Sequence, residues 1–185
     1  MENTGTIIIE TNRLLLRPFI NEDYENMFYN WANDSEVTKY LSWKAHKSTL
    51  ETKALVEMWV KEYANLNFYQ WVIELKDTKE IIGTISIVKE NNKVFEKELG
   101  YCIGKKYWNN GYVTEAGLAV LDHLFNTINC NRIVASFNIA NPASGKVMQK
   151  LGMTYEGTLR QSDLNNDGEL IDMVQYAILK EEFNK

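Results

Sequence analysis

Residues 100–116, GYCIGKKYWNNGYVTEA, contain the end of a strand, a polar loop and the start of a helix. The strand ends near Ile103, and Gly111 leads into the helix. We expect the backbone N–H groups of residues 109–114 to point into one concavity at the N-terminus of that helix. Unpaired N–H donors and the helix dipole both favour negative charge at such a place. The stretch therefore predicts an anion site, where Gly111 leaves room that a Cβ would fill.

The stretch does not follow the common nucleotide-binding motifs. No Gly-Lys-Ser/Thr follows Gly111, which excludes a P-loop, and the chain has no Gly-x-Gly-x-x-Gly fingerprint for a dinucleotide. A single glycine before a helix also occurs in ordinary connections. On these residues alone, both an anion site and a plain loop stay open.

Strand patterns surround this stretch on both sides. The expected strands are residues 68–75, 81–89, 98–103, 132–137, 154–163 and 170–179. An apolar face at helical spacing covers residues 113–128, and Asn141-Pro142 opens a short helix that ends at Gly152. The last two strands form a hairpin around the turn at residues 165–168.

The N-terminal part reads as one strand followed by two helices. The strand is RLLLRP at residues 13–18, and Asn21 caps a helix that runs towards Trp31. A second helix begins at Ser48, where Ser48-Thr-Leu-Glu51 has the capping-box pattern. We expect one stripe of this helix to face the core, made of Leu55, Met58, Trp59 and Tyr63.

The order of the elements predicts an α+β fold. Three strands in series, followed by strand–helix–strand crossovers, imply a mixed and mostly antiparallel sheet with splayed central strands, flanked by about four helices. The chain has 185 residues, which suits a single domain over residues 1–185 and leaves little room for two.

Composition excludes several classes of protein. A hydrophobic share of 45% excludes a mainly disordered chain. With 20 Lys and Arg against 25 Asp and Glu, the net charge of -5 argues against direct binding to nucleic acid. The two cysteines and two histidines have no metal-ligand spacing, so no metal is expected. No basic leader and no apolar run of about 20 residues occur, so we expect no membrane span and a cytoplasmic enzyme or binding module.

A second candidate site begins at the helix after the next strand. Asn141 and Ser144 lie at the start of that helix, where their side chains can cap it or contact a ligand. The two helix starts follow successive strands, so they can open on one side of the sheet. Together they outline a cleft between two splayed strands.

These segments carry a family resemblance. Residues 100–116 resemble the acetyl-CoA-binding segment of the GNAT N-acetyltransferases, and residues 141–153, NPASGKVMQKLGM, look like that superfamily's later cofactor helix. The opening TNRLLLRP at residues 11–18 and the tail EGTLR at residues 156–160, followed by Asp172, are similar to the RimJ/RimL branch, which acetylates the N-termini of ribosomal proteins. The resemblance covers nearly the whole chain.

The resemblance implies acetyl-CoA as the cosubstrate and no metal. Backbone groups of Tyr101, Cys102 and Ile103 would align the pantetheine arm, and Asn141 would bind the pantetheine or lie close to it. The residues that would cradle the pyrophosphate are Asn109, Asn110, Gly111, Tyr112, Val113 and Thr114.

Three positions depart from the family pattern. Trp108 stands where much of the superfamily has Gln or Arg, and Val113 stands where it has Gly or Ala. Met148 occupies the position of a tyrosine that protonates the thiolate in many relatives. The acid must therefore be Ser144, a water, or nothing.

The implied reaction is direct attack of a neutral amine on the thioester. Cys102 is not the expected nucleophile, because no histidine lies near it in sequence and a strand cysteine is usually a small core residue. An α-amine with a pKa near 8 is about one-tenth neutral at pH 7, whereas a lysine is neutral in under about one part in a thousand. A weak base therefore suffices, and the candidate is Glu98, just before the splayed strand end, with Glu96 on the same strand face. Either carboxylate can equally be a solvated edge residue.

Acceptor residues are expected in the helical N-terminal half and the final hairpin. Asp172 and Glu169 would attract a cationic amine, although an ordinary turn-and-strand charge pattern explains them equally well. Trp31 leads the aromatic candidates for lining the acceptor pocket, although aromatics at helical spacing are commonly core residues. The other aromatic candidates are Tyr40, Trp43 and Trp59.

The expected partner is an amine acceptor, first of all a ribosomal protein N-terminus. A polyamine or an aminoglycoside-like antibiotic is an alternative acceptor. A non-catalytic acyl-CoA-binding sensor is an alternative from another class of function. The sequence does not give the oligomeric state, and a homodimer stays open.

Overall fold

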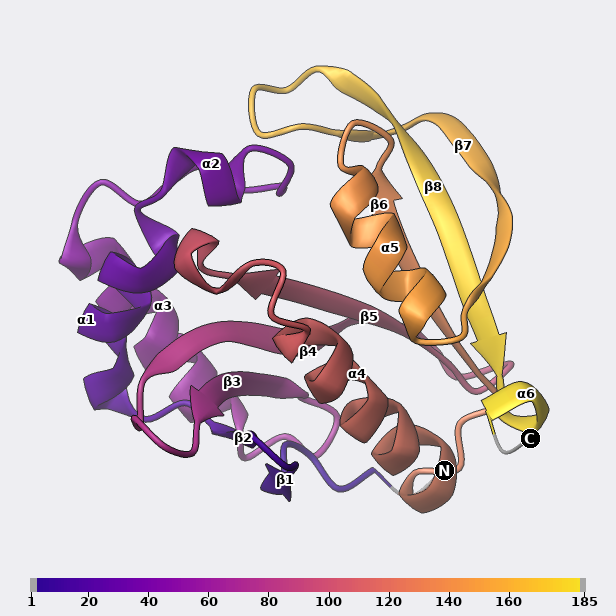
Figure 1. Cartoon of the computed structure of the whole chain (residues 1–185), viewed down its shortest axis with the longest axis horizontal. Helices are drawn as coiled ribbons and strands as arrows, with labels where there is room; N and C mark the ends of the chain where they lie inside the picture. Colours follow the sequence, from indigo (N-terminus) through magenta and orange to yellow (C-terminus); the bar gives the residue numbers. More distant parts are fainter. Residues whose placement is uncertain (1–2, 184–185) are drawn as a thin grey trace.

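A sheet of eight strands forms the centre of the computed structural model, which describes residues 3–183 (Figure 1). Across the sheet the strands follow the order β1-β2-β3-β4-β5-β6-β8-β7. Only β5 and β6 are parallel neighbours, and the other neighbouring strands are antiparallel. The strands are β1 Ile9–Glu10, β2 Leu14–Pro18, β3 Gln70–Leu75, β4 Ile81–Asn91, β5 Glu96–Ile103, β6 Arg132–Asn138, β7 Thr154–Leu164 and β8 Leu170–Leu179. The predicted mixed, mostly antiparallel sheet is confirmed.

Six α-helices accompany the sheet in residues 3–183. They are α1 Tyr24–Met27, α2 Ser35–Thr38, α3 Thr49–Glu62, α4 Tyr112–Asp122, α5 Pro142–Lys150 and α6 Lys180–Phe183. Single turns of other helix types extend two of them: Asn21–Asp23 and Phe28–Ala32 flank α1, and His123–Thr127 follows α4. The longer helical segments are therefore the run around α1, together with α3, α4 and α5. None of the helices in residues 3–183 combines the length and the hydrophobicity that a bilayer span requires.

The two central strands pair only at one end. Glu96–Glu98 of β5 pairs with Arg132–Val134 of β6, and no pairing continues beyond these residues. β5 runs on to Ile103 and β6 runs on to Asn138, so the two strands separate towards their C-terminal ends (Figure 1). The predicted splay is confirmed, and it leaves one edge of β5 unpaired next to the start of α5.

Side chains of β3 show how the two faces of the sheet are covered. Trp71 and Ile73 belong to the large core cluster that includes α4 and α5 residues, whereas Val72 belongs to a second cluster with α1 and α3 residues. Successive strand residues point to opposite faces, so the two clusters lie on opposite faces of the sheet. In β5, Tyr101 packs with the first cluster and Cys102 with the second.

Two expectations about α3 are wrong in detail. Ser48 is its N-cap but makes no side-chain cap bond, and the Glu51 carboxylate accepts from the N–H of Lys47 (2.8 Å) rather than from that of Ser48. Met58, expected in the core, is 50% exposed. Thr52 and Val56 are buried instead, and the Thr52 hydroxyl is hydrogen-bonded to the His46 ring (2.7 Å), which offsets the cost of burying it.

Candidate active site

Six consecutive backbone N–H groups at the start of α4 have no hydrogen-bond partner among the described residues. Within residues 3–183, the N–H groups of Asn109–Thr114 donate to no recorded acceptor, and pairing begins with the N–H of Glu115, which donates to the Gly111 carbonyl (3.0 Å). Gly111 has a φ of 77°, a left-handed conformation that favours glycine. A Cβ at Gly111 would meet only the Arg13 guanidinium, at 3.8 Å. The loop therefore offers free donors and open space, which suit a phosphate group.

Side chains of the loop itself hold this shape. The Asn110 side-chain amide donates to the carbonyls of Tyr107 (3.1 Å) and Trp108 (3.0 Å). Asn109 has a φ of 62°, which asparagine tolerates better than most residues. Val113 is buried, so only its backbone faces the loop. The Asn110 side chain is thus committed to the loop, whereas its N–H stays available.

Arg13, from the turn before β2, lies over the same loop, and the site prediction from sequence missed it. Its Nε pairs with a Glu115 oxygen (2.6 Å), and its Nη1 donates to the Asn110 carbonyl (3.1 Å). Its guanidinium lies 4.5 Å from the centre of the Tyr112 ring. Partial burial opposes ionisation of Glu115, but hydrogen bonds from Thr11 and Arg13 keep the pKa of this carboxyl below its ordinary value. These contacts connect the turn before β2 to the start of α4.

The unpaired edge of β5 presents two of the three residues expected along the pantetheine. The N–H of Gly104 donates to Ile82 of β4 (2.9 Å), so by alternation the backbone of Cys102 also faces β4. Tyr101 and Ile103 therefore face the opening, where the Ile103 carbonyl already accepts from the Trp108 indole (2.9 Å). The expected backbone role of Cys102 does not fit this alternation.

The Cys102 thiol is also unsuited to nucleophilic attack. Burial raises the pKa of Cys102 to about 12, so almost no thiolate exists near neutral pH. Its side chain packs with the cluster on the α1 and α3 face. Both observations agree with its interpretation as a small core residue.

At the start of α5, the Ser144 side chain is hydrogen-bonded to another residue, whereas the Asn141 side chain is not. Asn141 is the N-cap of α5 by position, yet within the described residues its side chain makes no cap bond. Its partly buried amide is therefore available to a ligand. Ser144 Oγ lies 2.9 Å from the Tyr101 hydroxyl, which also donates to the Ser144 carbonyl (2.9 Å). Met148 is buried one turn later and offers no proton.

Burial has a marked effect on Tyr101. It raises the pKa of Tyr101 to about 12, although the hydrogen bond to Ser144 acts in the opposite direction. The phenol therefore keeps its proton throughout the neutral range. Tyr101 and Ser144 form a pair of hydroxyl groups that joins β5 to α5 across the opening between β5 and β6.

Glu98 is the last residue of β5 that pairs with β6. Its carboxylate lies 3.6 Å from the Lys89 ammonium and is mostly shielded from solvent. Glu96, the alternative base, lies 2.7 Å from the Arg132 guanidinium. Of the two carboxylates, Glu98 is thus nearer the point where the strands separate and less tightly paired.

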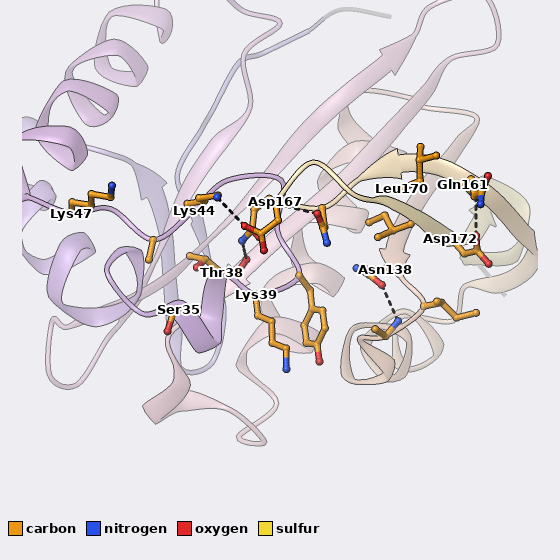
Figure 2. A pocket seen from close by; sticks show the side chains of 17 residues that line it. Ser35, Thr38, Lys39, Lys44, Lys47, Asn138, Gln161, Asp167, Leu170 and Asp172 are labelled. Carbon is orange, nitrogen blue, oxygen red and sulfur yellow. Dashed lines mark hydrogen bonds and ion pairs between the residues drawn. The ribbon is translucent and has the colours of Figure 1, made fainter.

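A cavity of about 830 Å³ opens between α2, the end of β6 and the β7–β8 hairpin (Figure 2). The hairpin tip closes one side of it: the Asn166 amide donates to the Thr38 carbonyl (3.1 Å), and the Lys44 ammonium lies 2.8 Å from Asp167. The end of β6 that borders the cavity, residues 138–140, immediately precedes Asn141. This position makes it the natural candidate for the acceptor pocket.

Some of the residues expected to contact the acceptor line this cavity, and others do not. Asp172 and Tyr40 line it, whereas Glu169 does not. The Asp172 carboxylate accepts from the backbone N–H of Gln161 (2.8 Å), so the hairpin uses part of its hydrogen-bonding capacity. Trp31 is 0% exposed and packs in the core, which contradicts its prediction as an acceptor contact. In residues 3–183, no group of three or more His, Cys, Asp or Glu side chains is placed to hold a metal ion.

Comparisons with known proteins agree with this geometry. The acetyltransferase (GNAT) domain family matches residues 13–154. An uncharacterized N-acetyltransferase of Bacillus subtilis, YoaA, is 34% identical over 173 residues, which are 94% of this chain and 97% of that protein. The Escherichia coli [ribosomal protein uS5]-alanine N-acetyltransferase is 33% identical over 103 residues, 55% of this chain and 53% of that protein. The crystal structure of a GNAT-family acetyltransferase from Bacillus anthracis has 30% identity and a TM-score of 0.83, and the match covers 95% of this chain and 100% of that one.

Proposed function

This chain belongs to the GNAT acetyltransferase family, and from that premise we propose that it moves the acetyl group of acetyl-CoA directly to a protein N-terminal α-amine of the ribosomal-protein type. The observation that carries the cosubstrate side of the proposal is the row of six unpaired N–H groups at the start of α4. The partial similarity to the uS5-alanine enzyme supports the acceptor class. The cytoplasmic location stays a prediction.

The cosubstrate would be held by backbone groups at both ends of the opening. The N–H groups of Asn109–Thr114 would bind the pyrophosphate, with the positive end of the α4 dipole behind them. The backbone of Tyr101, the N–H group of Ile103 and the side-chain amide of Asn141 would orient the pantetheine arm. Acetyl-CoA supplies the acetyl group as a thioester, a form already activated for attack by an amine.

The leaving sulfur must also gain a proton. Ser144 was the candidate from sequence, and the Tyr101 hydroxyl at 2.9 Å makes the acid a pair rather than a single group. Tyr101 stays protonated near neutral pH because burial raises its pKa to about 12. We assign the pair as one proton source, with Ser144 the more mobile hydroxyl and Tyr101 its hydrogen-bond partner.

The acceptor amine must lose a proton before or during attack. Glu98 is the candidate base, because it lies where β5 and β6 separate and its one recorded ion pair is the 3.6 Å contact with Lys89. An α-amine with a pKa near 8 needs little help at pH 7. The base therefore contributes modestly compared with the positioning of the two substrates.

One experiment tests the proposal as a whole. The protein is incubated with acetyl-CoA and a panel of N-terminal peptides, a polyamine and an aminoglycoside, and free thiol release is followed together with the masses of the products. We expect peptide products acetylated at the α-amine. Faster acetylation of the polyamine or the aminoglycoside would overturn the N-terminal acceptor. Tight coenzyme A binding with no thiol release for any amine would point to an acyl-CoA sensor instead.

A further inference from the structure

Asn138, the last residue of β6, is a polar residue in the wall of the cavity beside α2, and it is only 8% exposed. Its Oδ1 accepts from the backbone N–H of Ala140 (2.9 Å). A backbone N–H can pair only with the oxygen of an amide, so this contact also fixes the orientation of the Asn138 side chain. The NH2 group therefore lies at the other end of the amide.

This NH2 group has no acceptor within the part of the chain that the structure describes. The bond to Ala140 occupies the oxygen alone, and no bond donated by the nitrogen is recorded in residues 3–183. Figure 2 shows the Asn138 oxygen at the dashed bond and its nitrogen on the other side, directed into the cavity. A ligand that displaces water from the NH2 group must supply an acceptor in its place, because an unpaired buried donor costs about tenfold in affinity.

The turn that follows β6 places Asn138 close to the expected cosubstrate. The N–H of Asn141 donates to the Asn138 carbonyl (2.7 Å), so the two residues are the ends of one tight turn. Phe137 packs with the core cluster of α4 and α5, and the next strand residue points to the opposite face of the sheet. Asn138 thus faces the acceptor cavity, whereas Asn141 begins α5.

We propose that Asn138 selects the acceptor, because its NH2 group donates a hydrogen bond to a carbonyl oxygen that lies a few bonds from the reacting amine. This inference rests on the proposed function, since it takes the cavity as the acceptor pocket. In a peptide N-terminus, that oxygen is the first peptide carbonyl, whose carbon lies two bonds from the α-amine nitrogen. A polyamine has an amine but no carbonyl oxygen.

The surroundings of Asn138 also suit a peptide. Ile139, the next residue, is 52% exposed, and Leu170 at the start of β8 is 61% exposed. Both line the cavity. Apolar side chains of an acceptor would remove this surface from water, which is favourable. A peptide supplies a carbonyl oxygen together with such side chains, and a polyamine supplies neither.

Two matched acceptors test the inference. One is an N-terminal peptide, and the other is its twin in which a trans carbon–carbon double bond replaces the first peptide bond. The twins also differ in the basicity of the amine, so the measured quantity is the ratio of their kcat/KM values in each protein variant. That intrinsic difference cancels when the wild type is compared with a variant.

Asn138→Asp is the first variant, because it keeps an oxygen for the N–H of Ala140 and removes the NH2 group. We expect the preference for the peptide over its twin to fall about tenfold, the scale of one hydrogen bond. Asn138→Ala removes the NH2 group without adding a charge and should reduce the preference equally. Because the test is a ratio, a general loss of activity or stability in either variant does not affect it.

Asn91→Asp is the matched control. Asn91 is also the last residue of a strand, β4, and its Oδ1 also accepts from the N–H two residues later, that of Lys93 (3.2 Å). It is exposed and lies outside the cavity lining. We expect the wild-type ratio in this variant. A ratio that stays at the wild-type value in both Asn138 variants would overturn the inference.

Binding measurements separate this inference from the proposed function. Calorimetry with the two twins, in the presence of coenzyme A, needs no turnover. Tighter binding of the peptide than of its twin by the wild type, but not by Asn138→Asp, would support the inference even if no acetyl group is transferred. Acetylation of both twins with one ratio in every variant would leave the transferase standing and reject the role of Asn138. Absence of binding for both twins would also reject it.

Discussion

The Tyr101 hydroxyl lies 2.9 Å from Ser144 Oγ and 2.9 Å from the Ser144 carbonyl oxygen, so one side chain ties β5 to the start of α5. The two strands β5 and β6 have already separated at this level, and the phenol joins β5 to the helix that follows β6. The contact therefore has a structural part and, in our proposal, a chemical part. These two parts can be separated by experiment.

Tyr101→Phe is expected to lower kcat by about 10²-fold, because it removes one hydroxyl of the proposed proton source. The affinity for coenzyme A, measured by calorimetry, should change little, since backbone groups supply that binding. Tyr155→Phe is the matched control: its hydroxyl also pairs with a side-chain hydroxyl, that of Thr158 (3.1 Å), but on the exposed face of β7. A normal kcat in Tyr101→Phe would show that the contact between the Tyr101 and Ser144 hydroxyl groups is structural and supplies no proton.

The alkaline side of the pH profile gives a second test of Tyr101. A general acid must be protonated, so its contribution is present below its pKa and is lost as pH rises through it. Burial raises the pKa of Tyr101 to about 12, so kcat should show no fall due to this group at any pH up to about 10. A loss of kcat near pH 8 that is absent in Tyr101→Phe would contradict this protonation state.

Gly111→Ala is expected to weaken coenzyme A binding well beyond its effect on folding. A φ of 77° costs an alanine about 1–2 kcal/mol, and the new methyl group would stand where the phosphate is expected. Gly168→Ala carries the same backbone strain, with a φ of 83° and no atom within 4 Å of its Cβ, in the distant β7–β8 turn. Calorimetry with coenzyme A and thermal unfolding of both variants separate the two effects. Equal affinities of the two variants for coenzyme A would mean that Gly111 is needed for the backbone conformation of the turn and not for ligand binding.

Arg13→Gln is expected to raise the Kd for coenzyme A about three- to tenfold while kcat changes less. The guanidinium pairs with Glu115 at 2.6 Å and holds the Asn110 carbonyl, so its loss should loosen the loop that carries the unpaired N–H groups. The exposed Arg160→Gln is the control. A double-mutant cycle with Glu115→Gln should show that the two single effects are not additive. Additive effects would mean that Arg13 acts on the ligand without Glu115.

Local patterns were sufficient for the fold class and for the shape of the loop at residues 104–111. The strand, loop and helix of residues 100–116 adjoin one another in the chain, so their order predicts where the free N–H groups collect. The contacts that tune the site join distant residues: Tyr101 meets Ser144 43 positions later, and Arg13 meets Glu115 102 positions later. Sequence spacing carries no signal for such pairs.

The acceptor side was the hardest part to predict. Helical spacing placed Trp31 on an apolar helix face. It did not show whether that face packs in the core or borders the cavity. Asp172 was expected on the hairpin and lies on β8, but the cavity is also lined by Lys39, Lys44 and Lys47, which follow the end of α2. The charge of a pocket depends on every element that borders it, and the hairpin pattern describes only one of these elements.

Glu98→Gln is expected to lower kcat/KM for an α-amine acceptor about tenfold near pH 7, because the proposed base is lost while its shape is kept. The deficit should shrink towards pH 9, where most of an amine with a pKa near 8 is already neutral. Glu57→Gln is the control, since Glu57 is a half-exposed carboxylate on α3 with a similarly loose lysine contact, 4.0 Å from Lys53. The profiles are read from thiol release between pH 6 and pH 9. A deficit that stays constant with pH would show that Glu98 positions the strand end or the acceptor and removes no proton.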